Sequence, residues 1–78
     1  MAALRPIPAR KLKAMLEADG YSVQHEDDAN WIMDRGPEDE MLNLPKHGSV
    51  LAMEVMDSLL AKAKINDRKY FDLLARVS

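Results

Sequence analysis

The residues of this chain best suited to chemistry near neutral pH are its two histidines. His47 lies in the segment 44–49 (LPKHGS), between a strand-like pattern and a helix-like pattern. An imidazole at such a joint could contact a phosphate or transfer a proton, or it could only bond to the backbone of the loop. Sequence spacing fixes no acid and no second histidine beside His47, which favours the structural role.

His25 directly precedes an acidic run, residues 26–28 (EDD). Imidazole and carboxylate groups together can hold a metal ion. Acidic turns are usually just solvated, so we predict no metal site and no cofactor. The chain has no cysteine, which excludes thiolate catalysis, disulfides and zinc sites built on sulfur. No Ser/His/Asp order, glycine-rich phosphate loop or paired-carboxylate motif is recognisable.

Trp31 is the only tryptophan, and it lies in a strand-like run. Because side chains alternate along a strand, Trp31 and Met33 face one side, whereas Asn30 and Ile32 face the other. If the helices cover the side with Ile32, Trp31 is left on the outer face as a stacking platform or a partner anchor. Otherwise Trp31 is a core or half-covered residue.

The net charge of −2 is unevenly distributed. Residues 1–13 hold four bases and no acid, and they include Lys11 and Lys13. Residues 26–40 hold seven acids and one base. Such a distribution gives at most a local basic footprint for nucleic acid. Four of these acids lie in or beside a predicted turn between the second and third strands. They either face solvent in an ordinary loop or form a patch for a basic partner: Asp34, Glu38, Asp39 and Glu40.

Periodicity predicts the elements that must position these residues. Apolar spacing indicates a helix over 9–19 that ends at Gly20, and a longer helix from about residue 51 to 63. Alternation indicates three short strands over 21–25, around 31–33 and over 40–44, with Pro45 at a strand end or edge. Asn66 is a good N-cap for a last short helix. Short connections favour an antiparallel meander.

The expected fold class is therefore α+β, in the order α-β-β-β-α(-α), with a three-stranded antiparallel sheet and helices packed on one face. We expect a tail over 1–7 and a single domain over 8–76. No apolar run approaches the roughly 20 residues of a membrane span, and the first residues lack a signal-peptide pattern. We expect a cytoplasmic protein without membrane association. Homodimerisation is an option, because so small a core supplies little stability.

In the order of its elements and in the segments that connect them, this chain resembles the HicA/YcfA family of small RNA-directed toxins. The fold of that family is similar to the double-stranded-RNA-binding domain. The likeness covers roughly residues 8–74. It rests on residues 11–21 (KLKAMLEADGY), 44–48 (LPKHG), 56–63 (MDSLLAKA) and 65–74 (INDRKYFDLL). Between the last two helices the family often has glycine, whereas this chain has Lys64. The resemblance implies an RNA ligand and, for a toxin, a partner antitoxin.

The chain departs from the family at the position that the resemblance makes catalytic. Family toxins have Gly-Ser-His at the start of the second strand, and this chain has Asp28, Ala29 and Asn30 there. An asparagine side chain cannot act as a general acid or base near neutral pH, but it can still donate a hydrogen bond to a phosphate. This departure favours a binding function over an enzymatic one; if the protein is active, the resemblance implies a ribonuclease.

The favoured hypothesis is a non-catalytic RNA- or protein-binding module on a HicA-like scaffold. The alternatives are an mRNA interferase toxin that uses His47 or His25, and a small acidic, phage-type inhibitor that docks on a nucleic-acid-binding complex. The predicted contact residues are Lys11, Lys13, Asn30, Trp31, Lys46 and His47.

Overall fold

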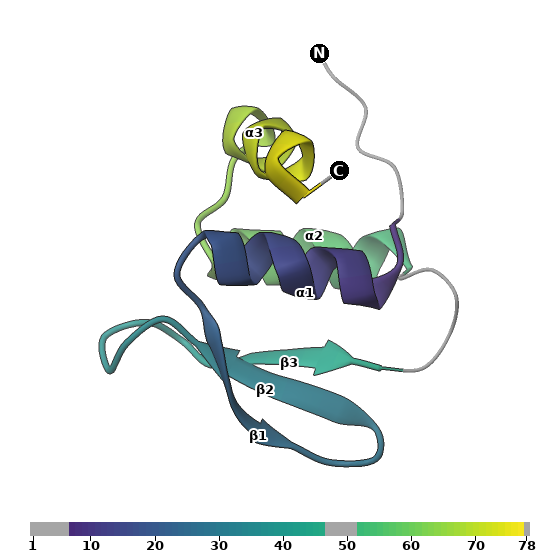
Figure 1. Ribbon diagram of the computed structural model, residues 1–78, viewed down its shortest axis with the longest axis vertical. Helices are drawn as coiled ribbons and strands as arrows, with labels where there is room; N and C mark the ends of the chain where they lie inside the picture. Colours follow the sequence, from purple (N-terminus) through teal and green to yellow (C-terminus); the bar gives the residue numbers. More distant parts are fainter. Residues whose placement is uncertain (1–6, 47–51, 78) are drawn as a thin grey trace.

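The computed structural model describes residues 7–46 and 52–77 of the chain. The elements are α1 (Ala9–Ala18), β1 (Ser22–Glu26), β2 (Asn30–Asp34), β3 (Leu42–Pro45), α2 (Met53–Lys62) and α3 (Asp67–Val77). This α-β-β-β-α-α order, with a three-stranded antiparallel sheet, confirms the predicted α+β class (Figure 1).

The sheet has the strand order β1-β2-β3, so β1 and β3 are its edges. Trp31 on β2 stands between Glu26 on β1 and Leu44 on β3. The β1–β2 register shifts between Val23 and His25, which places a bulge in β1. The β2–β3 register is regular along its whole length. A bulge protects an edge against further pairing, so the two edges of this sheet differ.

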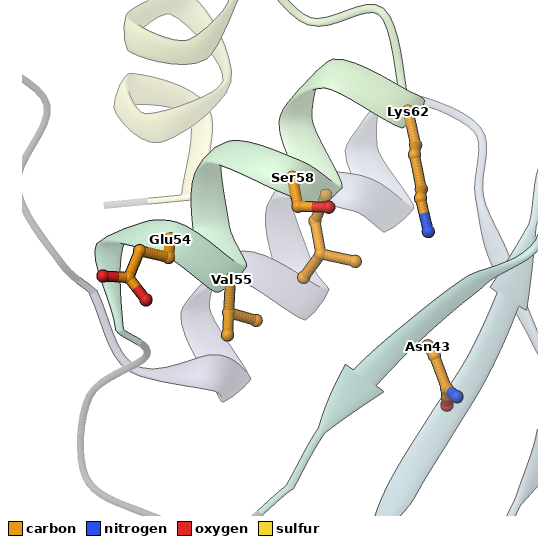
Figure 2. A pocket seen from close by; sticks show the side chains of 6 residues that line it. Asn43, Glu54, Val55, Ser58 and Lys62 are labelled. Carbon is orange, nitrogen blue, oxygen red and sulfur yellow. The ribbon is translucent and has the colours of Figure 1, made fainter.

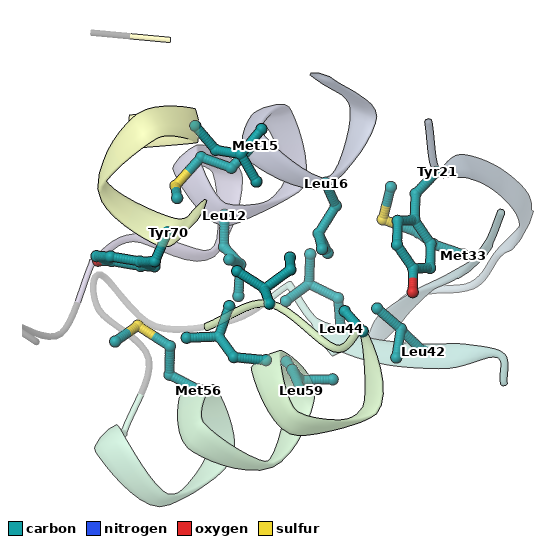
Figure 3. Close-up of a cluster of buried hydrophobic side chains, with 14 of the residues drawn as sticks. Leu12, Met15, Leu16, Tyr21, Met33, Leu42, Leu44, Met56, Leu59 and Tyr70 are labelled. Atoms are coloured by element: carbon teal, nitrogen blue, oxygen red, sulfur yellow. The ribbon is translucent and has the colours of Figure 1, made fainter. Parts of the chain in front are cut away.

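The core lies between one face of the sheet and the helices (Figure 3). Helices α1 and α2 cover this face, and α3 packs on α1 on the side away from the sheet (Figure 1). The core residues come from every element except β1, and Ile7, the last residue of the expected tail, is buried with them. The fully buried large side chains are Leu12, Met15, Leu16, Met33, Leu42, Leu44, Met56, Tyr70 and Leu73.

Helix α1 ends at Ala18, and Gly20 is part of the motif that stops it, as the sequence predicts. The Tyr21 N–H donates to the Leu16 carbonyl at 2.9 Å, and the Gly20 N–H donates to the Glu17 carbonyl at 3.1 Å. This pair of bonds is a Schellman motif, and it requires the positive φ of +101° that Gly20 adopts. Because the Tyr21 amide bonds back to α1, β1 starts at Ser22, one residue later than expected.

Helix α2 ends in the same motif, with Lys64 in place of glycine. The Ile65 N–H donates to the Leu60 carbonyl at 2.9 Å, and the Lys64 N–H donates to the Ala61 carbonyl at 3.1 Å. Lys64 has a φ of +59° and is the one residue other than glycine with a positive φ in the described parts of the chain. A turn geometry that glycine adopts freely is thus adopted here by a lysine, at a cost in strain.

Asn66 caps α3, as predicted. Its side-chain oxygen accepts the Lys69 N–H at 2.8 Å, and its carbonyl accepts the Tyr70 N–H at 2.8 Å. This cap lets α3 start two residues after the motif that ends α2. The turn between α2 and α3 is therefore fixed from both sides.

Candidate functional site

Trp31 lies on the face of the sheet that the helices cover. It shares this face with Met33, which is fully buried, and it packs against the core while remaining partly exposed. Of the two arrangements open from the sequence, the half-covered tryptophan is therefore the one observed. The indole stands at the margin of the core, where a ligand can still reach part of it.

Two lysine ammonium groups lie over the indole. The Lys13 Nζ on α1 is 5.4 Å from the ring centroid, and the Lys46 Nζ, just after β3, is 5.6 Å from it. Both distances allow a cation–π attraction. The fold thus brings together three of the six predicted contact residues, from three separate parts of the chain. We call Lys13, Trp31 and Lys46 the Trp31 cluster.

One carboxylate and one backbone carbonyl of the β1–β2 hairpin hold Lys46 in place. The Lys46 Nζ donates to Glu26 Oε2 at 2.5 Å and to the Asp27 carbonyl at 2.8 Å. Glu26 is the cross-strand partner of Trp31, and its side chain is 56% exposed. On the α1 side, Lys13 forms a looser ion pair with Glu17 at 3.5 Å. The positive charge of the cluster is therefore partly balanced by acids that face solvent.

The neighbouring hairpin turn is built around one carboxylate. Asp27 Oδ1 accepts the N–H of Ala29 at 2.9 Å and that of Asn30 at 2.7 Å. These two bonds lower the pKa of Asp27, since they favour its charged form. The Asp27 N–H in turn donates to the Asn30 carbonyl at 3.0 Å. Asp27, from the acidic run at 26–28, thus shapes the turn that leads into Trp31, and its carbonyl also accepts a bond from Lys46.

Two predicted contact residues lie apart from the cluster. Asn30 precedes Trp31 on β2, so its side chain belongs to the opposite, outer face of the sheet. Lys11 is two residues before Lys13, which is about 200° around the helix, so the two side chains leave α1 on nearly opposite sides. His25 pairs with Ile32 and is exposed on the outer face. His47 lies outside the described residues.

The predicted acidic patch is divided by an ion-pair network. Arg35 Nε binds Asp39 Oδ2 at 3.0 Å, and Arg35 Nη1 binds Asp19 Oδ2 at 2.5 Å. Asp19 also binds the Lys69 Nζ at 2.7 Å. The guanidinium of Arg35 lowers the pKa of Asp39. Arg35 therefore joins Asp39 in the loop to Asp19 at the end of α1, and Lys69 on α3 binds the same Asp19 carboxylate.

The remaining members of the predicted patch stay near the surface. Glu38 and Glu40 are exposed, and Asp34 is half-buried at the end of β2. The network with Asp19 does not follow from the sequence patterns, in which its one signal is Arg35, the single base in the acidic stretch 26–40.

A second surface feature is a groove between α2 and β3. It has a volume of about 280 Å³ and is lined by Asn43, Glu54, Val55, Ser58, Leu59 and Lys62. Figure 2 shows Val55 and Lys62 extending from α2 toward the strand. The groove shares no residue with the Trp31 cluster, and the sequence patterns alone did not indicate it.

Known proteins do not supply an assignment for either surface. No family model, no curated protein and no solved structure matches the chain. Within 7–46 and 52–77, no group of three or more His, Asp or Glu residues is arranged to hold a metal ion. No helix in the same ranges is long and apolar enough to cross a bilayer.

Proposed function

We propose that this protein is a non-catalytic RNA-binding module on a HicA-like scaffold, and that the Trp31 cluster is its contact site. The observation that supports this proposal is the convergence of Lys13 and Lys46 over the indole of Trp31. Two ammonium groups are suited to phosphate oxygens, and an aromatic face can stack on a base. The family resemblance, which implies an RNA ligand, agrees with this chemistry.

The acids around the cluster set the strength of such binding. Glu26 is more than half exposed, so its ion pair with Lys46 contributes at most about 1 kcal/mol and can be exchanged for a pair with phosphate. The net charge of −2 and the acidic turns would repel a long duplex. The proposal is therefore a short contact of one or two phosphates and one unpaired base.

The absence of catalysis in this proposal follows from the chemistry of the cluster. Lysine ammonium groups and an indole neither accept nor donate protons readily near neutral pH. Asn30, at the position that the resemblance makes catalytic, has no acid–base capacity and faces the other side of the sheet from Trp31. The residues of the cluster can therefore hold RNA but have no group that would cleave it.

Fluorescence of the single tryptophan provides the test, because Trp31 is the only indole in the chain. Titration with a structured RNA hairpin that has an unpaired loop is expected to change the Trp31 emission at low salt. Lys13→Gln and Lys46→Gln should each weaken binding and lower the salt slope by about one. Lys11→Gln removes the same charge from the other side of α1, so it is the matched control and should bind nearly as the parent protein does.

Glu26→Gln gives a test in the opposite direction. The substitution removes the acidic partner of Lys46, so the affinity for RNA should rise. The stability of the protein without RNA should not increase. Unchanged emission at low salt, or equal weakening by Lys11→Gln, would contradict the proposal. RNA degradation that is lost in His47→Ala would instead identify a ribonuclease. A stable complex with a basic protein assembly, weakened by Glu38→Lys with Glu40→Lys, would identify an inhibitor.

A further inference from the structure

The free edge of β3 has backbone groups that point away from the sheet. The Lys46 N–H donates to the Ala29 carbonyl, which marks the pair of residues 29 and 46 as hydrogen-bonded. Such pairs alternate along an antiparallel ladder, so Leu44 and Leu42 bond to β2, whereas Asn43 and Pro45 do not. The N–H and C=O of Asn43 and the C=O of Pro45 therefore face outward. No other strand of the described residues pairs with this side of β3.

Pro45 fits this assignment. A proline has no N–H to donate, and here the missing donor falls on the outward side, where the ladder with β2 does not need it. The opposite edge is different, because β1 has a bulge near Gln24 that interrupts regular pairing. The β3 edge is thus the one that is available for a further strand.

The groove beside this edge supplies contacts for side chains. Val55 and Leu59 give it an apolar wall on α2, while Glu54 and Lys62 stand near its two ends. Helix α2 runs opposite to β3, so Glu54 lies toward the end of β3 and Lys62 toward its beginning (Figures 1 and 2). Between its oppositely charged ends, the groove therefore has the apolar side chains of Val55 and Leu59 together with the polar Ser58.

The geometry favours a single extended strand over a second copy of the chain. Helix α2 packs over β3, and its contacts with the sheet are made to that strand. Two copies joined edge to edge would place their α2 helices over strands only about 4.8 Å apart, whereas packed helices need about 8–10 Å. An extended peptide has no such helix, and it fits between β3 and the overhanging side chains of α2.

The geometry points to a peptide-binding site in which an extended segment of a partner protein adds to β3 as a fourth, antiparallel strand. The residue opposite Asn43 exchanges two backbone hydrogen bonds with it, and an amide two residues earlier donates to the Pro45 carbonyl. Alternate apolar side chains of the segment lie against Val55 and Leu59. A basic residue precedes the apolar run and meets Glu54, and an acidic residue follows it and meets Lys62.

A blocked synthetic peptide tests this site directly. The probe contains Val-Thr-Val-Thr-Val, preceded by Lys-Lys and followed by Glu-Glu, and its control contains the same residues with the charged ends exchanged. Titration followed by NMR should shift and protect the Asn43 amide, and the control peptide should bind at least about threefold more weakly. Absence of any shift at about 5 mM peptide, or equal affinity for both peptides, would overturn the proposal.

Two variants separate backbone pairing from side-chain contact. Asn43→Pro removes the outward N–H without touching the ladder to β2, and it should weaken binding about tenfold. Asn43→Ala keeps the amide and should stay within about twofold. Equal loss in both variants would reject the added strand.

Charge exchange and self-association provide the remaining tests. The double variant Glu54→Lys with Lys62→Glu should invert the preference between the two peptides, and an unchanged preference would count against the assigned direction. Sedimentation of the protein alone should give the 8.8 kDa monomer at all concentrations. A dimer that Asn43→Pro dissociates would assign the edge to a second copy instead.

Discussion

Replacing Lys64 with glycine should stabilise the protein. Lys64 adopts a φ of +59° at the end of α2, which costs a residue with a Cβ about 1–2 kcal/mol relative to right-handed backbone. Glycine removes this cost but loses about 0.5–1 kcal/mol through the greater freedom of the unfolded chain. The difference is a net gain of about 0.5–1 kcal/mol. For a domain of this size, such a gain raises the melting temperature by about 2–8 °C.

Thermal unfolding followed by circular dichroism measures this gain, with Lys64→Ala as the matched control. Alanine removes the same long, exposed side chain and its weak attraction to Asp39, but it keeps the positive-φ strain. Lys64→Ala should therefore stay within about 0.5 kcal/mol of the parent protein. If Lys64→Gly melts at or below Lys64→Ala, the strain argument fails, because backbone conformation is what separates the two variants.

The other predictions concern the ion-pair network and a buried hydroxyl. Arg35→Met should lower the free energy of unfolding by about 2–3 kcal/mol, because it breaks charged hydrogen bonds to Asp19 and Asp39, whereas Arg76→Met, which breaks an exposed pair, should cost under about 0.5 kcal/mol. Urea unfolding measures the stability of both variants, and an equal loss of stability in the two would show that the network does not stabilise the fold. Because Arg35 lowers the folded-state pKa of Asp39, the stability from this pair is complete above the unfolded pKa of about 3.9 and is lost as pH falls through the folded value. Unfolding measured from pH 6 to pH 2 should thus show a smaller acid loss in Arg35→Met than in the parent protein, and parallel curves would contradict the assignment. Tyr21→Phe should leave stability equal or raise it by about 1 kcal/mol, because the buried Tyr21 hydroxyl has no hydrogen-bond partner among the described residues. A clear loss of melting temperature would show that this hydroxyl is bonded.

Local signals in the sequence were sufficient to place most of the elements. Gly20 and Asn66 predicted a helix end and a helix start because each position depends on hydrogen bonds within a few residues of the same chain segment. The third strand was less well placed, since it runs over Leu42–Pro45 rather than 40–44. Its start follows a loop that Arg35 ties to α1, and such a long-range ion pair leaves no periodic signal.

The candidate site was predictable in its residue types and less so in its geometry. Lys13, Trp31 and Lys46 were all chosen from the sequence, and the fold brings them together. Lys11 was chosen as part of the basic group in residues 1–13, and Asn30 because the resemblance places it at the family's catalytic position; each is a close sequence neighbour of a cluster residue. Helix and strand periodicity send these neighbours to other faces, and the side on which Trp31 falls depends on which face the helices cover. That choice is made by Met33 and its partner Leu42, both fully buried, and not by Trp31 itself.

The same geometry explains why one short sheet can present two separate surfaces. β2 is paired on both sides, so its backbone groups are bonded within the sheet and only the side chain of Trp31 is available to a ligand. Residues from α1 and β3 hold this side chain at the margin of the core. β3 is paired on one side, so it offers backbone groups at Asn43 while Leu42 and Leu44 stay in the core. A ligand that stacks and a ligand that adds a strand therefore need different parts of the molecule. A substitution at the Trp31 cluster should leave peptide binding unchanged, and one at Asn43 should leave RNA binding unchanged.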